Sequence, residues 1–206
     1  MFDAGLFGLL APKAYGGHEL PITDVMRVWE AVTRVDSAAG WNLVMNQGIA
    51  CFAAWLPEER AQELLTDGPT TAAGGFFPPG TGERVDGGWK VTARQPFVSG
   101  CHNAHWIWIP ALEAEGGEPV LDPDSGQPTA YGFFVPQEDI KIFDTWHTMG
   151  MRGTGSADVA VTDQFVPDRR VLPIGPLEHQ ALVSRGRSTG CFHCQLFWAR
   201  PRCPSV

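Results

Sequence analysis

The sequence predicts an α+β protein, in which an all-α helical segment comes first and an antiparallel β-barrel domain follows. Between residues 22 and 66, apolar residues recur with the period of helices. From Thr70 onward, short β-type runs alternate with turns rich in Gly, Pro and Asp. Because helices and strands are segregated along the chain, this order favours an α+β fold over a doubly wound sheet.

The first predicted helix has a single apolar stripe, with Thr23 as its predicted N-cap. The stripe consists of Val25, Val28, Trp29, Val32 and Val35. Such spacing places all five side chains on one face, which we expect to be buried.

Two further helices are predicted before residue 70. Residues 38–56 form an apolar segment into which polar Asn42, Asn46 and Gln47 are set. A third helix opens with Pro57 at a first-turn position and stops at Gly68-Pro69.

The β part begins with a hairpin over residues 85–91. Asp86 and Gly87 supply the positive φ angles that a tight hairpin turn requires. Residues 156–166 alternate between apolar and polar side chains and predict the last strand of the domain.

Two aromatic-rich strands are predicted between these, at residues 105–109 and 131–135. A polar loop over residues 113–128 separates them. Pro110 predicts that the first of these strands ends there or lies at a sheet edge, because proline cannot donate to a ladder.

The charge of the chain is divided unevenly along its length. Of the 206 residues, 15 are basic and 23 acidic, a net charge of −8, and residues 1–180 alone carry −12 because four arginines follow them. An acidic main body is a poor partner for phosphate backbones, which argues against nucleic-acid binding. With 44% hydrophobic and 18% charged residues, general disorder is also excluded.

The lack of recognisable targeting signals and the number of cysteines point to the cytoplasm. The N-terminal residues lack a basic segment, and no run reaches the roughly 18 apolar residues of a membrane span. Five cysteines are an odd number and do not form a disulfide framework. We therefore expect a cytoplasmic protein without a membrane partner.

Generic catalytic motifs are missing from the sequence. It contains no phosphate-binding Gly-Lys-Ser/Thr, no Gly-x-Gly-x-x-Gly, no His-Glu-x-x-His and no Gly-x-Ser-x-Gly. No pair of acid and base stands out, so no catalytic residue is assigned.

Four segments carry a resemblance to a known family. They cover residues 5–17 (GLFGLLAPKAYGG), 97–106 (FVSGCHNAHW), 144–156 (DTWHTMGMRGTGS) and 165–167 (FVP). Their order and spacing resemble the N-terminal helical and middle β-barrel domains of the acyl-CoA dehydrogenase superfamily. Trp146 and the Gly-Thr-Gly-Ser run that ends at Ser156 resemble the branch of two-component flavin-dependent monooxygenases.

The resemblance implies a division of the chain into a helical domain (1–68), a flavin-contacting β-barrel domain (69–175) and an atypical tail (176–206). It implies FAD or FMN as cofactor, a separate flavin reductase that supplies reduced flavin, and an aromatic or heterocyclic small-molecule substrate. The family's C-terminal helical bundle, which carries the catalytic base and the tetramer interface, has no counterpart here. We therefore expect weak flavin binding and little turnover from this chain, and we expect the homotetramer of the full-length family.

The resemblance also implies which residues line the flavin site. Phe97, Val98 and Ser99 would face the flavin ring, with backbone groups and the Ser99 hydroxyl near its N5/O4 edge. Phe77 would also contact the cofactor, in a segment where the dehydrogenases have Thr-Glu-Pro-Gly. That departure disfavours an acyl-CoA substrate.

The substrate pocket implied by the resemblance has walls from both domains. Phe76 and Trp146 would contribute from the β domain. Asn46, flanked by Met45 and preceded by Asn42, would form the helical wall.

Plainer interpretations of the same residues stay open. Phe97 and Trp146 are equally typical of core aromatics, and Ser99 of a turn. Asn42 and Asn46, one helical turn apart, are also typical of a solvated helix face.

Metal binding is not predicted. His102 and His105 would share one side of a strand, but no third ligand is evident. In the tail, Cys191, His193, Cys194 and Cys203 fit no common zinc-finger spacing, and we interpret them as accidents of composition, for example in a frame-shifted end.

Three functions follow as hypotheses. The leading one is a reduced-flavin monooxygenase that hydroxylates an aromatic or heterocyclic substrate. The alternatives are an FAD-dependent acyl-CoA dehydrogenase and a non-catalytic remnant of the fold.

Overall fold

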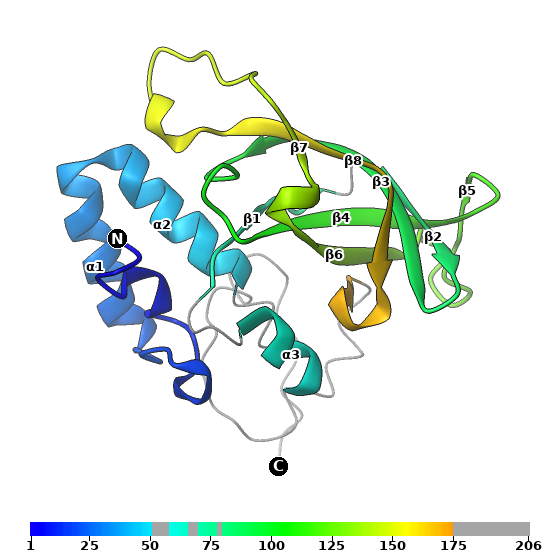
Figure 1. Cartoon of the computed structure of the whole chain (residues 1–206), viewed down its shortest axis with the longest axis horizontal. Coiled ribbons are helices and arrows are strands. Elements are labelled where there is room, and N and C mark those ends of the chain that lie inside the picture. Colours follow the sequence, from blue (N-terminus) through cyan, green and yellow to red (C-terminus); the bar gives the residue numbers. More distant parts are fainter. Residues whose placement is uncertain (51–57, 66–69, 78–79, 175–206) are drawn as a thin grey trace.

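A computed structural model describes residues 1–50, 58–65, 70–77 and 80–174 of the chain (Figure 1). The helices are α1 (Ile22–Val35), α2 (Ser37–Ala50) and α3 (Glu58–Leu65). The strands are β1 (Ala72–Gly74), β2 (Gly80–Val85), β3 (Gly88–Val98), β4 (Trp106–Glu115), β5 (Glu118–Pro119), β6 (Ala130–Pro136), β7 (Lys141–Phe143), β8 (Ala157–Pro167) and β9 (Val171–Pro173). Helices come first and strands follow, which confirms the α+β class.

Helix α1 begins earlier than its predicted cap. Pro21, with extended backbone, precedes the helix, and its carbonyl accepts from the amides of Asp24 and Val25. Thr23 therefore lies inside the first turn, and its prediction as N-cap was wrong. Val25 is fully buried as expected, whereas Val35 is 89% exposed because the helix ends there.

Helix α2 starts immediately after α1 and is capped by a side chain. The Asp36 carboxylate accepts from the amides of Ala38 and Ala39 at 2.8 and 2.9 Å, satisfying two donors that the helix itself leaves free. The helix is described up to Ala50. The rest of the predicted segment, Pro57, Gly68, Pro69 and the tail cysteines lie outside the described residues.

The described strands form one mixed sheet in the order β7-β8-β3-β2-β4-β6-β9. Strands β2 and β3 pair as the predicted hairpin, with Gly87 at φ +72° in the turn. The positive φ expected at Asp86 was wrong, because only Gly87 of the two adopts it. The expected all-antiparallel pairing was wrong at two places, because β1 and β2 both run parallel to β4. Other elements of the chain lie between each of these short strands and β4. Such a long connection allows the two paired strands to run in the same direction.

Pro110 lies inside β4, contrary to the predicted strand end. On one side of β4, Pro110 is in register with Gly132 of β6. On the other side, β1 ends opposite Trp108 and β2 begins opposite Leu112. Pro110 thus lies in the gap between two partner strands, where the missing N–H is not needed.

The predicted loop over residues 113–128 is partly strand. Strand β4 continues to Glu115 and turns through Gly116 and Gly117, at φ +59° and +88°, into β5. The two glycines permit this tight turn, because larger residues rarely adopt positive φ.

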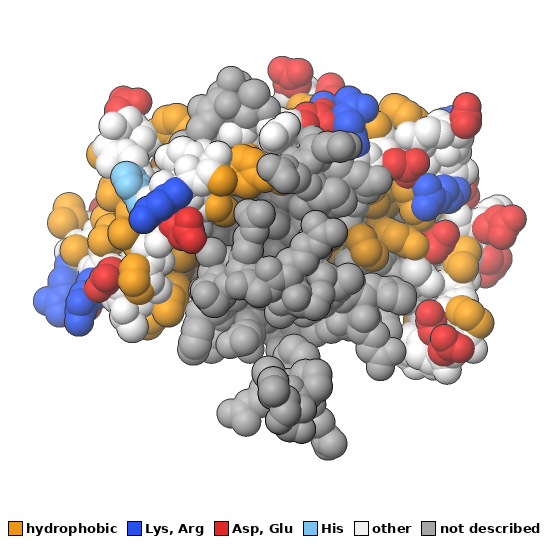
Figure 2. Space-filling view, turned by 90° about the horizontal axis from the view of Figure 1, so that it is seen from below, with side chains coloured by type: hydrophobic (Ala, Val, Ile, Leu, Met, Phe, Trp, Pro, Cys, Tyr) orange, Lys and Arg blue, Asp and Glu red, His pale blue; other side chains and the backbone are white. Residues whose placement is uncertain are grey.

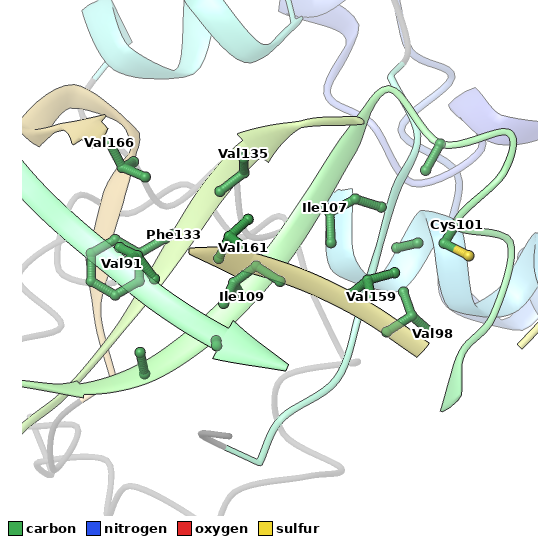
Figure 3. Close-up of a cluster of buried hydrophobic side chains, with 14 of the residues drawn as sticks. Val91, Val98, Cys101, Ile107, Ile109, Phe133, Val135, Val159, Val161 and Val166 are labelled. Carbon is green, nitrogen blue, oxygen red and sulfur yellow. The ribbon is translucent and has the colours of Figure 1, made fainter. Parts of the chain in front are cut away.

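One face of the sheet wraps around an apolar core (Figure 3). Side chains from β3, β4, β6 and β8 converge there, including the fully buried Phe133 and the almost fully buried Trp89. Their rings meet edge to face at 5.6 Å, a favoured aromatic geometry. This core holds β3 and β8 in place. Strand β3 ends near α2, and β8 begins near it.

The opposite face of the sheet is covered by α3. Leu64 and Leu65 pack with Trp108 and Phe134 in a second cluster. Gly132 leaves the room that the Trp108 indole needs, since a Cβ at that position would lie 1.8 Å from the ring. The sheet therefore packs on both faces: one faces the apolar core around which it curls, and the other packs against α3.

A charged cluster joins α3 to the residues just before β9. Glu63 accepts from Arg170 Nε at 2.8 Å and pairs with its Nη2 at 2.7 Å, and Arg169 donates to the other carboxylate oxygen. Burial alone would raise the pKa of Glu63, but the two arginines outweigh it and lower the pKa from its ordinary 4.5. We call this group the Glu63 junction.

On the face drawn in Figure 2, the acidic and basic side chains of the described residues are interspersed. Among those residues, no helix is long and apolar enough to cross a membrane.

Candidate functional site

One face of α2 docks on the end of β3 through polar side chains. Asn46 Nδ2 donates to the Ser99 carbonyl at 3.0 Å, and Trp41 Nε1 donates to the Ser99 hydroxyl at 2.9 Å. Asn42 makes a longer contact of 3.4 Å to the carbonyl of Gly153. Because Asn46 is only 3% exposed, its interpretation as part of a solvated face was wrong. We call these contacts the Ser99 junction.

The turn that follows Ser99 is shaped to receive Asn46. Gly100 has φ +76°, and a Cβ there would lie 2.7 Å from Asn46 Nδ2. Its amide donates to the Thr154 carbonyl at 2.9 Å. Glycine is thus required both for the backbone conformation and for the close approach of α2.

Phe97 is an exposed aromatic on a strained backbone. It has φ +60° at a register shift between β3 and β8, and its side chain is 71% exposed. A bulge of this kind turns a side chain away from the sheet. The alternative that Phe97 is a core aromatic was therefore wrong.

Trp146 reaches Phe97 from the segment between β7 and β8. The two rings meet edge to face with centroids 6.2 Å apart, and Trp146 Nε1 donates to the Met151 carbonyl at 3.0 Å. Trp146 is half-buried rather than enclosed in the core. The structure therefore brings two of the predicted site residues together at the surface beside Ser99.

Val98 points the other way. Its side chain is fully buried in the sheet core, as Figure 3 shows. Any contact of Val98 with a ligand would therefore run through its backbone.

A chain of buried hydroxyls extends from Ser99. Ser99 Oγ lies 2.7 Å from Ser156 Oγ, which lies 2.7 Å from Thr154 Oγ1. Thr154 Oγ1 donates to the Met151 carbonyl at 2.9 Å, the same carbonyl that accepts from Trp146. Trp41, Thr154 and Ser156 were not predicted as site residues, although the last two lie in the Gly-Thr-Gly-Ser run that marked the resemblance.

Phe76 and Phe77 follow β1. The residue before them, Gly75, is hydrogen-bonded to Gln95 of β3. With its amide oriented to satisfy both neighbours, buried Gln95 accepts from Gly75 N at 2.5 Å and donates to the Trp108 carbonyl at 3.1 Å. Phe77 is 80% exposed, while Phe76 is half-buried. Met45 on α2 is half-buried as well.

The prediction that the two histidines share a side was wrong. They are three residues apart, a spacing that gives opposite sides in a strand, and both precede β4, which begins at Trp106. His105 Nδ1 contacts the Thr71 hydroxyl at 2.9 Å, whereas the ring of His102 lies against Gly155. In the described part of the chain, no three His, Cys, Asp or Glu side chains are grouped as a metal would need.

One cavity lies apart from this site, and one buried cysteine near it is unreactive. A cavity of about 200 Å³ is lined by N-terminal residues, among them Phe2, Phe7 and His18, and by none of the predicted site residues. Burial raises the pKa of the Cys101 thiol, so this cysteine lacks the thiolate character of a nucleophile.

Comparison with known proteins supports the resemblance. Residues 1–67 match the acyl-CoA dehydrogenase N-terminal domain. The chain is 32% identical over 192 residues to the flavin-dependent monooxygenase oxygenase subunit HsaA of Rhodococcus jostii, covering 91% of this chain and 47% of HsaA. It is 34% identical over 164 residues to the indole-3-acetate monooxygenase of Acinetobacter baumannii, covering 79% and 40%.

The structure agrees with the sequence match. XiaF from a Streptomyces species, solved in complex with FADH2 and glycerol, superimposes with a TM-score of 0.73 at 31% identity, over 83% of this chain and 42% of XiaF. The described part of the chain therefore has the acyl-CoA dehydrogenase-like fold, and its relatives are two-component flavin-dependent monooxygenases. The chain spans less than half the length of each of these relatives.

Proposed function

We propose that this chain forms the helical and β parts of the oxygenase component of a two-component flavin-dependent monooxygenase. In this proposal, reduced flavin (FAD or FMN) arrives from a separate reductase, and an aromatic or heterocyclic small molecule is hydroxylated. The proposal includes the division into domains 1–68, 69–175 and 176–206, a cytoplasmic location and a homotetrameric whole protein.

The observation that carries the proposal is the exposed Phe97 ring beside Trp146. A left-handed backbone at a non-glycine residue costs roughly 1–2 kcal/mol. Here that cost presents an aromatic face to solvent instead of burying it. Strain kept at an exposed ring is typical of binding sites.

The residues present fit a flavin ring. Such a ring requires a flat apolar wall and a few fixed polar groups. Phe97 and Trp146 offer the wall, while Ser99 and the backbone of residues 97–99 offer polar groups held by Asn46 and Trp41. A bound reduced flavin would supply the reaction with oxygen, and this chain's residues would hold and orient the ring.

The substrate class follows from the same surroundings. Asn46 is committed to the Ser99 carbonyl, and Met45 and Phe76, which the resemblance assigns to the same pocket, are uncharged. A neutral, aromatic-lined wall matches a flat, uncharged substrate better than an acyl-CoA, whose CoA group carries charged phosphates.

Flavin affinity of the full chain tests the proposal. Phe97→Ala should weaken binding of anaerobically reduced flavin about tenfold, the magnitude of one aromatic contact. Phe165→Ala is the control, because Phe165 is also exposed, at 50%, but lies on β8 away from the Ser99 junction. Equal binding by wild type and Phe97→Ala would contradict the assignment.

A second measurement separates the two enzymatic hypotheses. Oxygen uptake that depends on a flavin reductase and an aromatic substrate supports the monooxygenase. Anaerobic reduction of bound flavin by an acyl-CoA would instead establish the dehydrogenase.

A further inference from the structure

The direction of the hydroxyl chain is fixed at its far end. A carbonyl oxygen accepts only, and each hydroxyl has a single proton to donate. Thr154 Oγ1 donates its single proton to the Met151 carbonyl at 2.9 Å. The bond between Thr154 and Ser156 therefore has to use the proton of Ser156.

The same argument passes to Ser99. Because the Ser156 proton is committed to Thr154, the 2.7 Å bond between Ser156 and Ser99 has to use the proton of Ser99. Trp41 Nε1, a donor only, occupies one lone pair of the Ser99 oxygen. Ser99 Oγ is left with one lone pair and no proton for anything outside the chain.

Burial keeps this arrangement from being exchanged with water. Ser99, Ser156 and Thr154 are 7%, 4% and 2% exposed. Reversing the chain would turn a lone pair of Thr154 Oγ1 toward the Met151 carbonyl oxygen at 2.9 Å. Two acceptors that close repel each other at a buried site, even though this carbonyl would still accept from Trp146 Nε1 and from the Thr154 amide.

We propose that Thr154 and Ser156 are specificity-determining residues that hold Ser99 as an acceptor toward the ligand. The inference rests on the proposed function. Reduced flavin carries a proton on N5 and can donate to the free lone pair of Ser99. Oxidised flavin presents a lone pair on N5 and meets another lone pair, so the site selects the reduced form.

The test compares the affinities of wild type and Thr154→Val for reduced and oxidised flavin. In Thr154→Val, Ser156 is free to donate to Ser99, and the Ser99 proton becomes available to oxidised flavin. The preference for the reduced form should fall about three- to tenfold, the range of one net hydrogen bond. Fluorescence titration under anaerobic and aerobic conditions gives both affinities without any turnover.

Two variants control for structural damage. Thr154→Ser keeps the hydroxyl and should keep the wild-type preference. Trp41→Phe removes a hydrogen bond to Ser99 but leaves its proton committed to Ser156, so the ratio of affinities should again be unchanged.

The outcomes separate this inference from the function on which it rests. A loss of preference in Thr154→Val, with Thr154→Ser like wild type, supports it. An unchanged ratio in Thr154→Val, or the same loss in Trp41→Phe, overturns it while the proposed function stands. Wild type that binds neither form of flavin overturns both.

Discussion

The helices meet the sheet at two junctions of opposite chemistry. At the Ser99 junction, neutral donors from α2 reach buried oxygens of β3, and Asn46 is 3% exposed. At the Glu63 junction, α3 is held by two arginines, and the side chain of Arg169 is 56% exposed. Buried neutral hydrogen bonds depend strongly on geometry, whereas partly exposed ion pairs tolerate movement and respond to pH and salt.

This contrast indicates which junction has to be accurate. The Ser99 junction positions Phe97 and Trp146, and a change in the distance between their rings would alter ligand binding. The Glu63 junction lies where α3 covers the opposite face of the sheet. We therefore expect changes at the first to alter binding as well as stability, and changes at the second to alter stability alone.

The largest effect is expected for Gly100→Ala. The added Cβ meets both a φ of +76° and Asn46 Nδ2 at 2.7 Å. Strain and overpacking together should lower the free energy of unfolding by about 2–4 kcal/mol in urea denaturation. Gly87→Ala is the matched control, since φ is +72° there but the space is open; it should cost only about 1 kcal/mol. Equal losses would show that α2 does not press on this turn.

Asn46→Ala is expected to come next. It leaves the Ser99 carbonyl without its Asn46 donor, which should cost about 1–3 kcal/mol of unfolding free energy. Asn42→Ala should cost less than about 1 kcal/mol, because its contact is longer, at 3.4 Å, and less buried. A larger loss at Asn42 would reverse the assignment of the docking contact.

The Glu63 junction predicts a dependence on pH. Its lowered pKa means that the folded state favours the charged carboxylate, so this stability is present above pH 4.5 and is lost as the pH falls through the lowered value. Glu63→Gln should cost roughly 1 kcal/mol at pH 7 and little in acid. The loss caused by Asn46→Ala should be the same at both pH values, and a matching pH dependence would contradict the distinction between the junctions.

The smallest effects are expected for the two arginines taken singly. Arg170 is 22% exposed and its guanidinium also lies over the Trp106 ring at 4.9 Å. Arg170→Ala should therefore cost more than Arg169→Ala, by about 0.5 kcal/mol or more. Thermal unfolding of the two variants measures the order directly.

Local patterns were sufficient to predict most elements. The Asp86-Gly87 turn and the alternation over residues 156–166 are properties of neighbouring residues, and both are confirmed. Pro110 was misjudged because its place between β1 and β2 depends on partners distant in the sequence. Thr23 was misjudged because the backbone of Pro21 already begins the helix.

The site shows the same division. Resemblance pointed to Phe97, Ser99 and Trp146, which the fold brings to one place. Trp41 could not be found from local sequence, because its role depends on a contact 58 residues away along the chain. The contribution of Val98 was predicted without its orientation, which only the wrapping of the sheet determines.

Hydrogen–deuterium exchange of the full chain, with and without anaerobically reduced flavin, tests most directly whether the Ser99 junction faces the ligand. The predicted result is added protection of amides in residues 97–103 and 144–156, around Phe97 and Trp146. Protection confined to residues 2–18, which line the N-terminal cavity, would contradict it.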